Sequence, residues 1–250
     1  TINTDVKAGV SRDALNYVDT TLAKISTWGS GNVYAANDVT MPGTVMTKDV
    51  TVQPAVAGVN AFADASSSGH VITANNSAAA TTAKYMVGTH SIDVVGSKNF
   101  TIPDHADWTP SGDFTYEFWM WPNGNQASWS GIAHQYGGSR GLEIGFSNAT
   151  TLYCEHSSKG GLTYAPSLSA WHHVAFVRDG NTGRLYVDGV ERDTDATYTG
   201  SMNNPTGVMR FGGLLAATWN NNWSGYLDEI RFSNVCRYPN GATFTADETL

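Results

Sequence analysis

Two stretches of this sequence combine aromatic rings with amide side chains, the combination that binds sugars. An aromatic ring stacks on the apolar face of a pyranose, while Asn and Gln side chains hydrogen-bond its hydroxyls. One stretch is Trp219-Asn-Asn-Asn-Trp223, and the other runs from Gln126 to Tyr136. We predict carbohydrate-binding residues at Trp219, Asn220, Asn221, Trp129, His134 and Tyr136.

Catalytic patterns are missing from the sequence. A glycoside hydrolase needs two carboxylates on one cleft, and the six glutamates form no E-x-D-x-E array. No nucleophile-elbow motif supports Ser-His-Asp chemistry, and Gly137 to Arg140 reads as a hairpin turn. His172 and His173 are adjacent, so a strand would place them on opposite faces, and we expect His173 to be a hydrogen-bonded core residue. We predict that the protein is not an enzyme.

Metal binding is not indicated by any ligand pattern. Aspartates in predicted turns or strand ends could serve calcium, but none of them forms a D-x-D-x-D loop. These aspartates are Asp104, Asp107, Asp113, Asp188 and Asp228. We expect Asp228 to accept hydrogen bonds from backbone amides instead. We predict no cofactor, and the sequence leaves calcium undecided.

Charge and composition exclude several partner classes. The formal net charge is −8 with only 14 Lys and Arg, which argues against a nucleic-acid surface. No apolar run reaches the ~18 to 20 residues that span a bilayer, so we expect no membrane insertion, and no signal-peptide pattern is visible. Cys154 and Cys236 each lie beside strand-like residues, and we expect free thiols rather than a disulfide.

The elements that must position these residues are β-strands. Trp171 to Gly189 contains two apolar runs around the turn cluster Asp179 to Gly183, which predicts a hairpin with Trp171 buried on a central strand. In Phe114 to Trp121, alternate residues share a face, with Glu117 on the face opposite Phe114. Further strands are expected at 132–135, 141–146, 150–155 and 208–211.

Residues 1–84 differ from the rest of the chain in amino-acid composition and in hydrophobic pattern. Residues 5–28 have the only helical period, with Leu15, Val18, Leu22 and Ile25 forming an apolar stripe. Residues 33–84 are rich in Ala, Thr, Ser, Val and Asn and carry too few large side chains to build their own core. We predict an arm that docks or oligomerises, so we expect a homo-oligomer.

Four motifs carry a family resemblance. They are WHHVAFVRDG with RLYVDG (171–189), DFTYEFWMWP (113–122), GYLDEIRF (225–232) and SIDVVGSKNFTIPD (91–104). In this order they resemble the laminin-G-like domains of the concanavalin A-like lectin superfamily, across roughly residues 85 to 238. The resemblance implies that Trp223 is a core residue. Many relatives read F-D-G where this chain reads Val94-Val95-Gly96, which puts a family-style calcium site in doubt.

The resemblance completes the predicted architecture and function. We expect an all-β protein, a two-sheet antiparallel jelly-roll sandwich over residues 85–250, behind a helical and extended arm over residues 1–84. Arg237-Tyr238 and Phe244 resemble the tails of such domains in bacteriophage virion proteins. This favours a non-enzymatic module on a virion surface or other extracellular assembly. It would bind a cell-surface glycan or polysaccharide and contact other virion proteins through residues 1–84. The alternatives are a structural assembly protein without sugar binding and, last, a polysaccharide-active enzyme.

Overall fold

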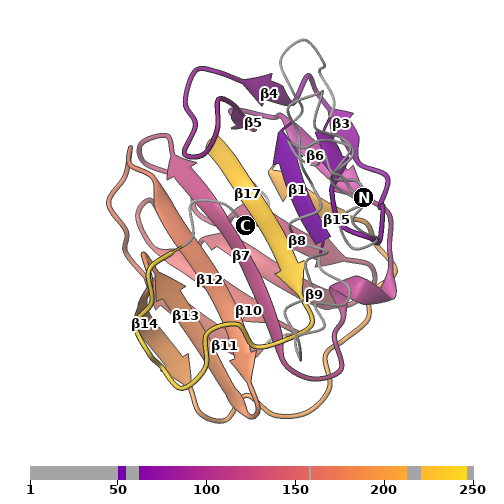
Figure 1. Ribbon diagram of the computed structural model, residues 1–250, viewed down its shortest axis with the longest axis vertical. Helices are drawn as coiled ribbons and strands as arrows, with labels where there is room; N and C mark the ends of the chain where they lie inside the picture. Colours follow the sequence, from indigo (N-terminus) through magenta and orange to yellow (C-terminus); the bar gives the residue numbers. More distant parts are fainter. Residues whose placement is uncertain (1–49, 55–61, 158, 213–220, 247–250) are drawn as a thin grey trace, which may run out of the picture. The chain divides into compact units, whose positions relative to one another are not determined.

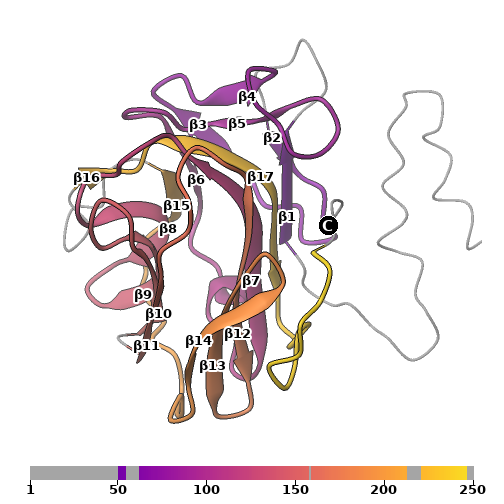
Figure 2. The ribbon, with the colours of Figure 1, turned by 90° about the vertical axis from the view of Figure 1, so that its left-hand side faces the viewer.

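The computed structural model describes residues 50–54, 62–157, 159–212 and 221–246 (Figure 1). They form two antiparallel β-sheets packed face to face, seen edge-on in Figure 2. The predicted all-β sandwich is confirmed. Within the described ranges the only helical turn is the 3₁₀ helix η3 (Ala106–Trp108), and no helix there is long and apolar enough to cross a membrane. The helix predicted over residues 5–28 lies outside the described residues.

Sheet A has the strand order β14-β13-β12-β7-β17-β1-β2, with β5 also paired to β17 and β4 to β5. Figure 1 shows β17 between β7 and β1. The strands of sheet A are β1 (Val50–Pro54), β2 (Phe62–Asp64), β4 (Ala79–Thr81), β5 (Ser91–Asp93), β7 (Phe114–Pro122), β12 (His172–Asp179), β13 (Thr182–Val187), β14 (Val190–Asp195) and β17 (Gly225–Ser233).

Sheet B has the strand order β11-β10-β9-β8-β15-β6-β3, and the short β16 pairs in parallel with the start of β8. The strands of sheet B are β3 (Thr73–Asn75), β6 (Asn99–Ile102), β8 (Ser130–Tyr136), β9 (Arg140–Phe146), β10 (Leu152–His156), β11 (Lys159–Tyr164), β15 (Met209–Gly212) and β16 (Asn221–Asn222).

The core lies between the sheets and follows the two-residue period of the strands. On β7, Phe114, Tyr116, Phe118 and Met120 are all buried between the sheets, as the alternation predicted. Trp223 is fully buried, which confirms its expected core position. Each such ring removes a large apolar area from water, which is the main stabilising contribution to a sandwich of this kind.

The hairpin of β12 and β13 is tighter than the sequence predicted. Asp179 pairs with Thr182, so the loop holds two residues, Gly180 and Asn181, rather than the five expected. Gly180 has a φ of +62°, which a side chain would strain. Trp171 is a second correction, because it precedes β12 and is only half-buried, with its ring edge against Trp121 at 5.9 Å. Backbone pairing with β7 begins one residue later, at His172.

Segments before residue 85 contribute strands to both sheets. The backbone of β1 pairs with β17, β3 pairs with β6, and β4 pairs with β5. These strands are short and carry small side chains, so they extend the sheets that the later, aromatic-rich strands build.

The outer face of sheet A carries a buried charged cluster beneath the C-terminal segment. Glu117 on β7 and His173 on β12 are fully buried and 3.2 Å apart, which confirms the expected core role of His173. Arg237 lies 2.7 Å from Glu117, and the Tyr238 hydroxyl donates to it at 2.6 Å. Tyr238 and Phe244 stack with centroids 3.6 Å apart, and Figure 1 shows this segment crossing the sheet.

Both cysteines are free thiols, as expected. Cys154 is buried in the core on β10, and burial raises the pKa of its thiol. Cys236 is half-buried beside the outer face of sheet A, packed against Ala175, Val177 and Tyr186. A raised pKa keeps a thiol protonated and unreactive, so neither residue is poised as a nucleophile.

Candidate functional site

Trp129 and Asn221, which the sequence placed in two separate stretches, meet at the start of β8. The backbone amide of Asn221 donates to the Trp129 carbonyl at 3.3 Å, and the Asn221 side chain donates to the Ser128 carbonyl at 2.7 Å. Asn221 then pairs with Ser130 as β16 joins β8. The described part of one stretch, at Asn221, thus lies directly beside residues 128–130 of the other.

Trp129 is an exposed aromatic in a constrained backbone. Its side chain is 45% exposed, and its φ of +55° lies in the left-handed region that costs a non-glycine residue energy. The hydrogen bond from Asn221 and the entry into β8 hold it there. Strained residues of this kind are concentrated at ligand sites, since the surrounding structure must compensate the strain.

Tyr153 is a site residue that the sequence analysis missed. It lies on β10 between the core residues Leu152 and Cys154, so it faces outward from sheet B. Its ring meets that of Trp129 edge to face, with centroids 5.8 Å apart. In the sequence, Tyr153 is a single tyrosine between apolar residues. This pattern does not show that Trp129 lies beside it on the same sheet.

A charged network fixes the Tyr153 ring. Its hydroxyl donates to Glu155 at 2.6 Å, and Glu155 also receives a hydrogen bond from the Arg140 guanidinium. Arg140 lies 3.2 Å from Glu143, which pairs across the strands with Glu155. Burial, followed by the hydrogen bond to Glu155, raises the pKa of Tyr153, so its hydroxyl stays a donor at neutral pH.

His134 lies in the same sheet but cannot reach a ligand at the surface. Its side chain is fully buried, and it packs directly over Gly131, where a Cβ would clash with the imidazole. Burial and the nearby Arg210 lower the pKa of His134 to about 3. The ring is therefore neutral and structural.

The remaining predicted residues fall in three places. Tyr136 is at the far end of β8, about 20 Å from Trp129 at ~3.3 Å per residue, so the structure does not bring the two together. Trp219 and Asn220 lie outside the described residues, although they immediately precede Asn221 in the sequence. Gln126 is nearly buried and holds the loop by donating to the carbonyls of Gly124 and Ser224.

All five aspartates considered for calcium have protein hydrogen-bond partners. Asp228 accepts from the amides of Met86, Val87 and Glu229, as the sequence analysis expected. Asp188 binds His172, while Asp113 and Asp104 accept from Gly180 and Gln135. The fifth, Asp107, lies beside two histidines.

The family comparison identifies the same sandwich. A family profile described as the concanavalin A-like lectin/glucanases superfamily matches residues 95–240. A search of curated proteins returned no match. The matched range contains Trp129, Tyr153 and Asn221, so the surface described above belongs to the family's own domain.

Solved structures share the fold at low sequence identity. The binding domain of Paraclostridial Mosquitocidal Protein 1 has a TM-score of 0.56 and 14% identity, over 75% of this chain and 48% of that one. The botulinum neurotoxin serotype G binding domain has a TM-score of 0.56 and 10% identity, over 78% and 48%. The serotype D ligand binding domain, in complex with N-acetylneuraminic acid, has a TM-score of 0.58 and 10% identity, over 75% and 47%. This chain spans about half the length of each, and the similarity establishes the fold alone.

Proposed function

The chain belongs to the concanavalin A-like lectin/glucanase superfamily, and from this premise we propose that it is a non-enzymatic, carbohydrate-binding module. The surface that binds the sugar is centred on Trp129 and Tyr153, with Asn221 at its edge. The observation that carries the proposal is the exposed indole of Trp129, fixed in a left-handed backbone beside an amide-rich strand.

The chemistry of this surface suits a sugar ring. The indole offers a flat apolar face. At its border the Tyr153 hydroxyl, whose proton is donated to Glu155, can accept a hydrogen bond, and the exposed Asn222 amide can both donate and accept. Residues 219 and 220 add a second indole and a further amide in the adjoining sequence, and we include them in the proposed site. The serotype D neighbour, 47% of which this chain matches, is a ligand binding domain in complex with N-acetylneuraminic acid, and this supports a sugar as the class of ligand.

Catalysis is the weaker candidate because the cross-strand carboxylate pair beside Tyr153 is already engaged by an arginine. Glu143 and Glu155 face each other across β9 and β10, as a glycosidase would require. Both are almost completely buried, and both contact the same Arg140 guanidinium. A glycosidase needs both carboxylates to line an open cleft around the substrate, whereas these two are buried against Arg140. Their role in the proposal is to hold Tyr153 in place.

The test is a glycan array on the full chain, followed by titration calorimetry with the best ligand. Trp129→Ala should weaken binding by about tenfold, because an aromatic contact contributes up to ~1.5 kcal/mol beyond its buried area. The matched control is Tyr85→Ala, since Tyr85 is 47% exposed and adjoins Met86, which contacts sheet A. Equal loss in both variants, or no glycan retained by the wild type, would favour a structural assembly protein without sugar binding.

We also propose the setting of the module, a bacteriophage virion or other extracellular assembly. The part of residues 1–84 that precedes β1 would attach it, since β1 to β4 belong to the sandwich itself. The support is the apolar stripe Leu15, Val18, Leu22 and Ile25, which needs a partner helix, together with the tail resemblance at Arg237-Tyr238. Light scattering should find a homo-oligomer that Leu15→Asp with Leu22→Asp dissociates. A monomeric wild type would reject oligomerisation through the arm.

A further inference from the structure

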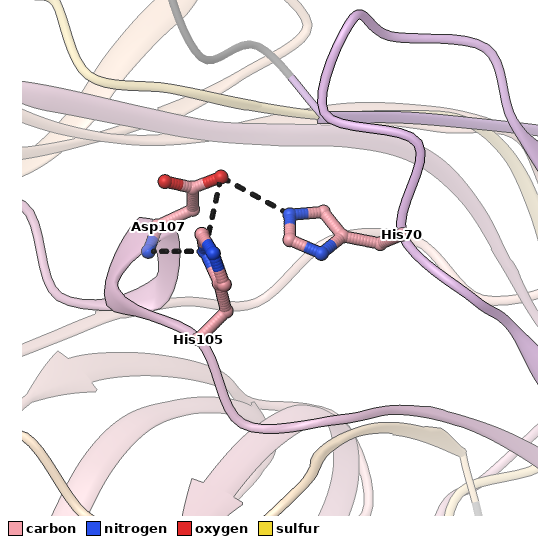
Figure 3. Close-up of side chains that lie close together, drawn as sticks. All are labelled: His70, His105 and Asp107. Carbon is pink, nitrogen blue, oxygen red and sulfur yellow. Dashed lines mark hydrogen bonds and ion pairs between the residues drawn. The ribbon is translucent and has the colours of Figure 1, made fainter.

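His70 lies beside His105 and Asp107, which are two residues apart in sequence, in a cluster separate from the Trp129 surface (Figure 3). His70 Nε2 lies 3.1 Å from Asp107 Oδ2, and His105 Nδ1 lies 3.2 Å from the same oxygen. All three ligand atoms are within 4.8 Å of one another. Two nitrogens and one carboxylate oxygen are thus aimed at a common volume.

Rigid elements hold the three side chains. His105 and Asp107 belong to the cap and first turn of η3, whose Trp108 is fully buried and donates to the Pro103 carbonyl at 2.9 Å. His70 lies in the loop between β2 and β3, where its amide donates to Asp64 at 2.7 Å. Its ring packs against those of Trp108 and His105, with centroids 4.9 and 4.7 Å away.

His105 Nδ1 is close to two groups of Asp107, its backbone amide and its carboxylate oxygen. The Asp107 amide donates to His105 Nδ1 at 3.2 Å, so this nitrogen carries a lone pair. The Asp107 carboxylate oxygen, also an acceptor, lies at the same distance from it. Two acceptors at this distance repel each other, and a metal ion bound by both would remove that repulsion. The Nδ1 lone pair would then bind the ion in place of the Asp107 amide. His105 is half exposed and can rotate to direct its lone pair.

We propose that His70 Nε2, His105 Nδ1 and Asp107 Oδ2 form a binding site for a divalent transition-metal ion of the zinc type. Tetrahedral zinc at ~2.0 to 2.1 Å from its ligands places those ligands about 3.3 to 3.4 Å apart, close to the two distances observed to Asp107. Ser68 donates to the same Asp107 oxygen at 3.2 Å and supplies the supporting hydrogen bond.

The ligand types select the metal class. Imidazole nitrogens suit zinc, copper, nickel and cobalt, whereas calcium and magnesium prefer oxygen ligands alone. Three protein ligands leave one tetrahedral position, which can take water or a ligand's oxygen. His105 is the ligand that is half exposed. This site is independent of the proposed sugar surface.

The test titrates the full chain with Zn²⁺ alone by calorimetry and with Co²⁺ by visible absorption, which reports tetrahedral coordination. One equivalent should bind the wild type and raise its melting temperature by about 5 °C at saturating metal. His105→Ala and Asp107→Asn should each abolish binding, and Ser68→Ala should weaken it by about tenfold. His90→Ala, a histidine outside the cluster, should bind as the wild type does, and Ca²⁺ should not compete.

His105→Ala is the deciding variant, because a half-exposed side chain can be removed without unfolding the protein. Circular dichroism confirms that each variant is folded before titration. Absence of Zn²⁺ binding by the wild type, or equal affinity in wild type and folded His105→Ala, would overturn the site. Loss of glycan retention in Trp129→Ala with Zn²⁺ binding intact would separate this result from that of the proposed function.

Discussion

His173 Nε2 and Glu117 Oε2 lie 3.2 Å apart on adjacent strands of sheet A, and neither side chain is exposed to solvent. Burial alone would raise the pKa of Glu117, but the hydrogen bond to His173 and the charges of Arg237 and Arg231 outweigh it and lower the pKa. The carboxylate is therefore ionised inside the protein, and its partners depend on it.

Replacing Glu117 with Gln should lower the free energy of unfolding by about 3 to 5 kcal/mol, since it leaves buried positive groups without their counter-charge. Chemical denaturation at pH 7 measures this. Glu191→Gln is the control, because Glu191 pairs with Arg184 at a partly exposed position and should cost no more than about 1 kcal/mol. Similar losses in the two variants would contradict the importance assigned to the buried cluster.

Stability should fall as the pH drops below about 6.5. Burial lowers the pKa of His134 to about 3 and of His156 to about 4. Between pH ~6.5 and these lowered values, the unfolded chain binds protons at the two histidines and the folded chain does not. Each histidine therefore contributes fully to the free energy of unfolding above pH ~6.5. This contribution falls by up to about 1.4 kcal/mol per pH unit as the pH drops toward the folded pKa. Asp228, whose pKa burial raises to about 6, titrates in the opposite sense and offsets part of the loss.

Denaturation midpoints at pH 7, 5.5 and 4.5 measure this dependence, and His134→Leu should flatten it. A stability that rises on acidification in the wild type would show that Asp228 dominates the two histidines.

Trp171→Ala should lower the free energy of unfolding by about 1 to 2 kcal/mol, and Trp223→Ala should lower it by about 3 to 5 kcal/mol. The difference follows from burial, because Trp223 is fully buried while Trp171 is half-buried ahead of β12. Urea denaturation of both variants gives the two values, with the dependence of the unfolding free energy on urea concentration held equal for the two fits. Equal costs would mean that Trp171 is part of the core after all.

Gly207→Ala should destabilise the protein by about 3 kcal/mol, since its Cβ would overlap the backbone carbonyl of Tyr136 at the end of β8. Gly112→Ala is the matched control, with nothing within 4 Å of its Cβ, and should change stability by less than about 0.5 kcal/mol. Thermal melts of the pair are sufficient. A neutral Gly207→Ala would contradict the close approach of these two backbones.

Strand alternation made much of the fold predictable from sequence. In β7 every second residue is a large apolar one, and the period of two allows only one orientation against the core. Trp171 was misplaced because alternation continues into the residue before β12, where pairing has not begun. Sequence pattern reports which face a residue would take, but not where hydrogen bonding starts.

The candidate site was only partly predictable, because it depends on contacts between distant strands. Trp129 and Asn221 were selected by composition, yet their hydrogen bond results from the parallel pairing of β16 with β8. The position of Tyr153 depends on the register in which β10 pairs with β9. His134 packs over Gly131, where the pairing of β8 with β9 is irregular. Whether these residues bind sugar stays a prediction.

The place of β17 in sheet A sets an order for folding during synthesis. Val50 in β1 pairs with Phe232 in β17, and β17 also joins β7 and β5. β17 must therefore be synthesised before the middle of this sheet can form. Until then, the earlier strands have unpaired edges. Such long-range pairing slows folding to the range of milliseconds or longer. The nascent chain is thus exposed to aggregation, and the C-terminal strand completes the protein last.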